Sequence, residues 1–92
     1  MLRVSRLRLR DVNWIGGGAL DEAFAERRSV SVKLRSTQPP RDGLLFEAEG
    51  GPCVELPSGE YGVATGQACV FYENGGGSAR VLGGGFIDRT VA

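Results

Sequence analysis

Apolar and polar residues alternate along much of this chain, which is the pattern of half-buried β-strands. The alternation is strictest over residues 29–35, where valine and leucine occupy every second position, and it returns over residues 44–49. Pro39 and Pro40 lie between the two segments, and proline cannot donate a hydrogen bond to a strand ladder. We therefore predict a hairpin with a loop at residues 36–42.

Three more short strands are predicted toward the carboxyl end. Residues 53–56 form the first, and a turn is expected at residues 57–60. Residues 67–73 are apolar on both faces, which predicts a central strand that is covered on two sides. Residues 79–88 supply the last strand, which three consecutive glycines should bend sharply.

The amino-terminal segment is also strand-like, but its apolar residues change phase. Leu2 and Val4 share one face whereas Leu7 and Leu9 share the other, so a bulge or a stretch of coil must intervene. Residues 19–26 are the only segment with helical spacing, and they predict one short helix.

Short strands at this spacing, joined by glycine-rich turns, favour an all-β fold. We expect a small closed or partly open antiparallel barrel of about six strands, because closure removes exposed strand edges. The 92 residues fit a single domain, 1–92. No run approaches the roughly 20 apolar residues that span a bilayer, and the start lacks a secretory signal, so we expect a cytoplasmic protein with no membrane partner.

The composition argues against catalysis by this chain alone. Histidine is absent, which removes the commonest general base and most metal sites. Cys53 and Cys69 form no C-x-x-C motif, and we interpret them as buried free thiols, a disulfide being the alternative. The triple glycines lack the strand-to-helix context of a phosphate-binding loop. We therefore expect no catalytic residue, no metal and no cofactor here.

Charge is segregated along the chain although 11 basic residues balance 11 acidic ones. Basic residues crowd the first ten positions and residues 27–41, whereas every charged residue from 42 to 60 is acidic. Two interpretations are open. The basic segments can form a binding face, or they can pair with the acidic strands, since opposite charges across a sheet stabilise it.

Lys33, Arg35 and Arg41 surround the proline loop and are our candidate phosphate contacts. The competing interpretation pairs Lys33 and Arg35 with Glu47 and Glu49 across the predicted hairpin.

Aromatic residues beside arginine could stack on unpaired RNA bases. Phe46 and Phe71 lie in phase with aliphatic neighbours, so we expect both in the core. Trp14 and Tyr61, which adjoin polar loops, are the candidates for exposure.

Three motifs of the chain are similar to motifs of a known protein family. The run GVATGQACVFYENGGGSARVLGGGFI at residues 62–87 resembles the end of bacterial tRNA-specific 2-thiouridylases, which carry a similar GQ-A-C-V-F-Y stretch and then LGGG. VNWIG at residues 12–16 and VKLRSTQPP at residues 32–40 occur in the same order in that family. The resemblance covers nearly the whole chain, although Thr65 stands where the family commonly has proline.

The resemblance implies a β-barrel like domain 2 of elongation factors, which follows an ATP-using domain and a linking domain. It implies that ATP and the catalytic cysteines belong to those earlier domains, so this chain is expected to be a carboxyl-terminal fragment. Cys53 and Cys69 inherit no catalytic role. The implied task is to help hold the tRNA anticodon arm for an enzyme that 2-thiolates the wobble uridine.

Two other functions stay open from the sequence. The barrel could pack against its sister domains with little RNA contact, which an exposed apolar patch would favour. It could also be an independent small binding protein with a Cys53–Cys69 bridge.

Overall fold

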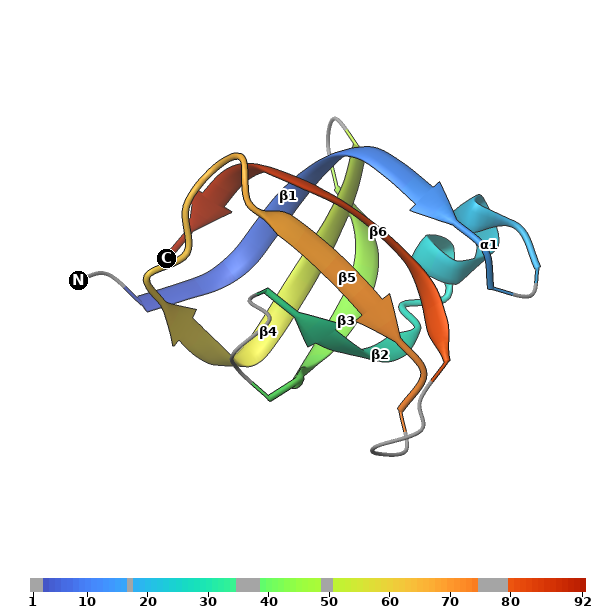
Figure 1. The fold of residues 1–92 in the computed structure, drawn as a ribbon. Helices are drawn as coiled ribbons and strands as arrows, with labels where there is room; N and C mark the ends of the chain where they lie inside the picture. Colours follow the sequence, from blue (N-terminus) through green and yellow to red (C-terminus); the bar gives the residue numbers. More distant parts are fainter. Residues whose placement is uncertain (1–2, 17, 35–38, 49–50, 75–79) are drawn as a thin grey trace.

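The computed structural model describes residues 3–16, 18–34, 39–48, 51–74 and 80–92. Within these ranges the chain forms six strands and one short helix (Figure 1). In chain order the elements are β1 (Arg3–Trp14), α1 (Leu20–Ala25), β2 (Ser29–Lys33), β3 (Arg41–Ala48), β4 (Gly51–Tyr61), β5 (Ala68–Tyr72) and β6 (Val81–Val91). No helix in the described ranges has the length and apolar character needed to cross a bilayer.

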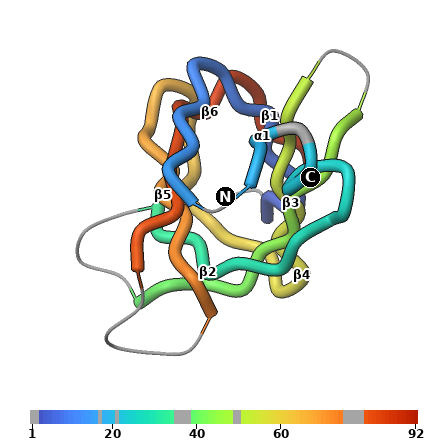
Figure 2. The backbone as a smooth tube through the Cα atoms, turned by 90° about the vertical axis from the view of Figure 1, so that its right-hand side faces the viewer, coloured from blue at the N-terminus to red at the C-terminus, as the bar shows by residue number. Residues whose placement is uncertain are grey.

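The six strands close into an antiparallel barrel in the order β1-β4-β3-β2-β5-β6. Closure is made by β1 and β6, which come from opposite ends of the chain and lie side by side in Figures 1 and 2. Each of the six described strands therefore has two partners, and closure leaves none of them as an edge strand. The predicted all-β barrel with one short helix is confirmed.

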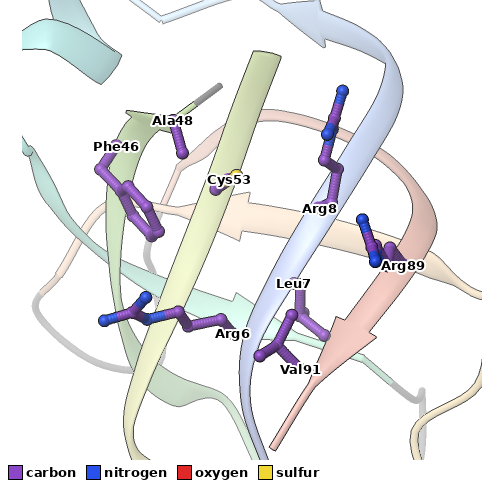
Figure 3. Close-up of a pocket in the computed structure, with 8 residues that line it drawn as sticks. All are labelled: Arg6, Leu7, Arg8, Phe46, Ala48, Cys53, Arg89 and Val91. Atoms are coloured by element: carbon purple, nitrogen blue, oxygen red, sulfur yellow. The ribbon is translucent and has the colours of Figure 1, made fainter. Parts of the chain in front are cut away.

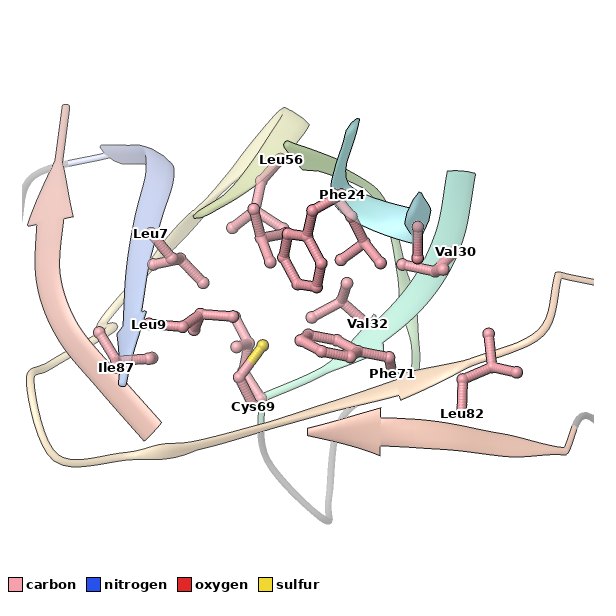
Figure 4. Close-up of a cluster of buried hydrophobic side chains, with 14 of the residues drawn as sticks. Leu7, Leu9, Phe24, Val30, Val32, Leu56, Cys69, Phe71, Leu82 and Ile87 are labelled. Carbon is pink, nitrogen blue, oxygen red and sulfur yellow. The ribbon is translucent and has the colours of Figure 1, made fainter. Parts of the chain in front are cut away.

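The core fills the barrel with one face of each strand (Figure 4). Helix α1 adds Phe24, whose ring meets that of Phe71 edge to face, with the centroids 6.3 Å apart. Fully buried aliphatic side chains surround this aromatic pair: Leu7, Val30, Val32, Leu45, Val54, Leu82 and Ile87. Phe71 is thus in the core, as predicted.

The phase change expected near the amino terminus is produced by bulges in β1. Val4, Leu7 and Leu9 are all buried, and the register against β4 shifts between Val4 and Arg6. Further shifts against β6 allow Asp11 to adopt a positive φ of 52°. A bulge shifts the in–out alternation of a strand by one residue, so that apolar residues before and after it can both point into the core.

The same register shift between β1 and β4 replaces the turn predicted at residues 57–60, and the prediction of a turn is wrong. These residues belong to β4, but Val4 pairs with Glu60 whereas Arg6 pairs with Glu55, so the residues between leave the ladder. Pro57 is tolerated there because a residue outside the ladder does not need a backbone N–H to donate.

The predicted two-sided burial of residues 67–73 is also wrong. Cys69 and Phe71 point into the core, but Ala68 on the other face of β5 is exposed. A barrel has only one interior, so the apolar residues on the outer face of its strands are only partly covered.

The predicted hairpin forms, but its register differs from the expectation. β2 meets β3 with Val32 opposite Arg41, and Glu47 pairs with Pro52 of β4 instead. The pairing of Lys33 with Glu47 is therefore wrong; Arg35 and Glu49 lie outside the described residues. Gly43 suits this register, because a Cβ there would lie 2.6 Å from a methyl carbon of Val32.

Candidate nucleic-acid interface

The sequence RLRLR at residues 6–10 builds a basic outer face on β1. Leu7 and Leu9 point into the core, so Arg6, Arg8 and Arg10 must point outward. Alternation along a strand thus converts a run of arginines into one row of cations on the barrel surface.

The neighbouring strands complete a pocket around this row. Arg8 is directly opposite Arg89 of β6 on one side and Cys53 of β4 on the other, and Cys53 in turn is opposite Phe46 of β3. The pocket has a volume of about 170 Å³ (Figure 3). Its lining residues are Arg6, Leu7, Arg8, Phe46, Ala48, Cys53, Arg89 and Val91.

The pocket carries positive charge and no carboxylate among its lining residues. Burial raises the pKa of the Cys53 thiol above its ordinary value, while the nearby charges of Arg8 and Arg6 oppose that rise. The local potential therefore favours anions, although Cys53 itself stays a protonated thiol near neutral pH.

Four arginines lie with their guanidinium groups over aromatic rings. The guanidinium carbons of Arg6 and Arg27 lie 6.0 and 5.9 Å from the centroid of Phe46. Arg10 stacks similarly over Phe86, and Arg28 over Trp14. A ring fixes the position of a guanidinium without neutralising its charge, so the N–H groups of such an arginine can still donate to phosphate oxygens. Arg10 differs, because it also forms an ion pair with Asp11 at 2.8 Å.

Phe46 is where the sequence-based interpretation fails. We predicted it in the core, but Leu45 is the fully buried neighbour and Phe46 is half-buried on the outer face. The segment admits two phases because Leu44 and Leu45 are both apolar, and the glycine at position 43 decides between them. Tyr61 is exposed, as considered possible, whereas Trp14 packs partly against the core.

The structure places two of the three predicted phosphate contacts. Lys33 ends β2 and Arg41 begins β3, so both lie at the root of the loop between these strands. Arg41 forms an ion pair with Glu60, at 2.9 Å between Nε and Oε2. Glu60 is only 6% exposed, so Arg41 compensates a buried carboxylate. Arg35 lies outside the described residues.

The pocket of Arg6, Arg8 and Arg89 was missed by the sequence-based interpretation. The signal on β1 was available, since RLRLR alternates strictly. The contribution of Arg89 was not, because it depends on the β1–β6 pairing, which joins residues about eighty positions apart.

The described residues bring together no group of three or more His, Cys, Asp or Glu side chains that could hold a metal ion. Cys53 and Cys69 are both free thiols.

The fold and the pocket together define a small antiparallel β-barrel domain with a basic outer face. Residues 4–87 match the family model described as the aminomethyltransferase beta-barrel domain, and the chain belongs to that family. No solved structure matches the chain.

The curated relatives are more specific. A tRNA-specific 2-thiouridylase MnmA of Bradyrhizobium sp. is 54% identical over 99% of this chain. The enzymes of the same name from Rhodopseudomonas palustris and Nitrobacter winogradskyi are 56% and 52% identical over 94% and 99% of it. The chain corresponds to the carboxyl-terminal domain of these relatives and spans only 22–23% of their length. The resemblance inferred from the sequence motifs is confirmed.

Proposed function

We propose that this chain is the accessory domain that binds and positions tRNA in a cytoplasmic enzyme that 2-thiolates the wobble uridine. The names of its relatives, tRNA-specific 2-thiouridylases, support tRNA as the substrate. ATP and the catalytic residues then belong to other domains of the enzyme, which are the partners of this barrel. The anticodon arm is the part of the tRNA that it holds.

The arginine pocket carries this proposal. Arg6, Arg8 and Arg89 converge from two strands on one outer face, and no acid lines the pocket between them. Guanidinium groups match phosphate oxygens with paired N–H donors, which is why arginine dominates contacts to the nucleic-acid backbone. Such contacts position an RNA without reading its sequence, as an accessory domain requires.

Lys33, Arg35 and Arg41 are proposed as a second group of phosphate contacts. Lys33 and Arg41 lie on adjacent strands, and 45% of the Arg41 side chain is exposed despite its ion pair with Glu60. Arg41 can therefore use its remaining N–H donors toward RNA while it neutralises Glu60.

Titration of labelled tRNA with this chain at low salt tests the proposal. We expect weak binding, and we expect Arg8→Gln and Arg89→Gln each to weaken it about five- to tenfold, as loss of one charged phosphate contact should. Arg80→Gln is the charge-matched control, because Arg80 is exposed, faces Glu73 at 3.8 Å and lies outside the pocket. Absence of binding, or equal losses in all three variants, would contradict the proposal.

The alternative of a barrel that packs on sister domains has one observation in its favour. Ile15 is 64% and Val81 39% exposed, and they flank Leu82, whose carbonyl accepts the Ile15 N–H. In the full-length enzyme, Ile15→Ser should loosen the barrel from the catalytic domains if this patch is covered there. Unchanged tRNA binding by the isolated Ile15→Ser chain would show that the two surfaces act separately.

A further inference from the structure

Arg8 and Arg89 face each other across the β1–β6 ladder. Like charges directly opposite across a sheet repel one another and raise the local positive potential. Arg6 lies two residues before Arg8 on the same face, so a third cation adds to the repulsion. An anion between the guanidinium groups would be attracted to both of them and would relieve their mutual repulsion.

The opposite side of the pocket is apolar. Phe46 and Ala48 of β3 form this wall, and the thiol of Cys53 on β4 lies between the wall and β1. Val91 of β6 is on the cationic side, directly opposite Arg6. In Figure 3, Arg6 extends toward the ring of Phe46, whereas Arg8 and Arg89 lie together farther along the pocket. The cationic part and the apolar part are thus adjacent but distinct.

A double-stranded RNA would not contact the apolar wall of the pocket with its bases. Its bases are stacked inside the helix, and it presents phosphates and riboses to a protein surface. An unpaired nucleotide offers both components, a phosphate and a flat base that packs on aromatic and guanidinium surfaces. The pocket, at about 170 Å³, is a small recess that can take part of one such residue and is not a track for a helix.

We propose that this pocket is a subsite for one unpaired nucleotide of the bound RNA, with its phosphate between Arg8 and Arg89 and its base against Phe46 and the guanidinium of Arg6. This inference rests on the proposed RNA-binding function and adds the structural class of RNA that the pocket takes. The arginines supply charge, and Phe46 selects unpaired over paired RNA.

Binding of the 92-residue chain to two fluorescent RNAs at 50 mM salt tests the subsite. One probe is a single-stranded oligouridylate, and the other is a blunt RNA duplex with the same number of phosphates. The single strand should bind at least about tenfold more tightly, and Phe46→Leu should remove most of that preference, since base–aromatic stacking contributes at this scale. Arg8→Gln should weaken binding of both probes.

The outcomes separate the two proposals. If tRNA binds and Arg8→Gln weakens it, but the duplex binds as well as the single strand or Phe46→Leu affects both probes equally, the subsite is wrong and the RNA-binding function stands. If no RNA binds, both fail. Uridine monophosphate should displace the single strand at lower concentration than inorganic phosphate does, and equal displacement would reduce the pocket to an anion site and overturn the inference.

Thiol protection in the unmodified chain gives a second measurement that does not depend on a variant's folding. Cys53 lines the pocket, whereas Cys69 is fully buried in the core and serves as the internal reference. Saturating single-stranded RNA should slow alkylation of Cys53 severalfold and leave Cys69 unchanged. An unchanged Cys53 rate under saturation would overturn the proposed location.

Discussion

At the scale of single residues, Arg41 has a structural role as the ion-pair partner of the buried Glu60 carboxylate. Glu60 accepts a hydrogen bond from the Tyr61 backbone N–H through Oε1, and its other oxygen faces Arg41. Glu60 is the buried charged side chain of the described barrel, so its partner is a structural residue wherever RNA binds.

Arg41→Ala should therefore lower the free energy of unfolding by about 1–3 kcal/mol, less than for a fully buried pair because Arg41 is partly exposed. Lys33→Ala at the same end of the barrel is the control and should stay within about 0.5 kcal/mol. Adding Glu60→Gln to Arg41→Ala should recover part of the loss, because the unpaired charge is then removed. Urea denaturation measures all three, and equal stability of Arg41→Ala and Lys33→Ala would contradict this role.

The Cys69 thiol predicts an alkaline limit to stability. Burial raises its pKa from 9.0 to about 12, so the unfolded thiol loses its proton at a lower pH than the native one. Between these values the native state binds more protons, and stability falls as the pH rises. At pH 10 the loss attributable to Cys69 is about 1.4 kcal/mol relative to pH 8.

The difference in slope between the unmodified chain and Cys69→Ala isolates this effect from other groups that titrate in alkali. Denaturant midpoints measured from pH 8 to 10 should fall less steeply for Cys69→Ala, even though that variant starts less stable. Parallel curves for the two proteins would show that the thiol does not carry the effect.

At the scale of elements, helix α1 depends on the barrel beneath it. It has six residues and no side-chain cap at its amino end, and so short a helix is unstable alone in water. Phe24, only 2% exposed, fastens it to Phe71 and the core.

Phe24→Ala should cost about 3–5 kcal/mol, the usual range for removing a buried aromatic side chain, and should release α1. Leu20→Ala is the matched change on the same helix, and because Leu20 is only partly buried it should cost much less. Chemical denaturation gives the energies, and hydrogen exchange at residues 23–26 reports whether the helix detaches. Similar costs for the two variants would mean that Phe24 does not anchor the element.

Element positions were readable from the sequence wherever one face alone is apolar. β2 and α1 fall close to their predicted ranges for this reason, and the phase change in β1 predicted its bulge. β3 was predicted in the wrong phase because its adjacent leucines are apolar on either face. The observed phase places position 43 where a Cβ would lie 2.6 Å from Val32 and 3.2 Å from Val54, which only glycine avoids. The pocket could not be predicted in this way, because its residues come together only through the pairing of four strands, β6, β1, β4 and β3.

At the scale of the whole molecule, a net charge of zero coexists with a locally basic face. Long-range steering depends on the summed charge, whereas backbone binding depends on how many phosphates are contacted. A neutral barrel can therefore bind RNA weakly and still show strong salt dependence. Composition alone could not reveal this, because only the barrel gathers arginines from residues 6–8 and residue 89 onto one surface.

The salt dependence of tRNA binding should count those contacts. The pocket arginines Arg6, Arg8 and Arg89 alone would give a slope of log affinity against log salt of about −2.1 to −2.7, or a loss of about 20- to 40-fold between 50 and 200 mM. With the proposed second group of Lys33, Arg35 and Arg41, we expect a slope of about −4 to −5. Arg8→Gln should make the slope shallower by about 0.7–0.9, while Arg80→Gln, with the same change in net charge, should leave it unaltered. A slope of only about −2 to −3 would mean that the pocket binds RNA without the Lys33, Arg35 and Arg41 group. An equal effect of the two glutamine variants would instead mean that overall charge, and not the pocket, governs binding.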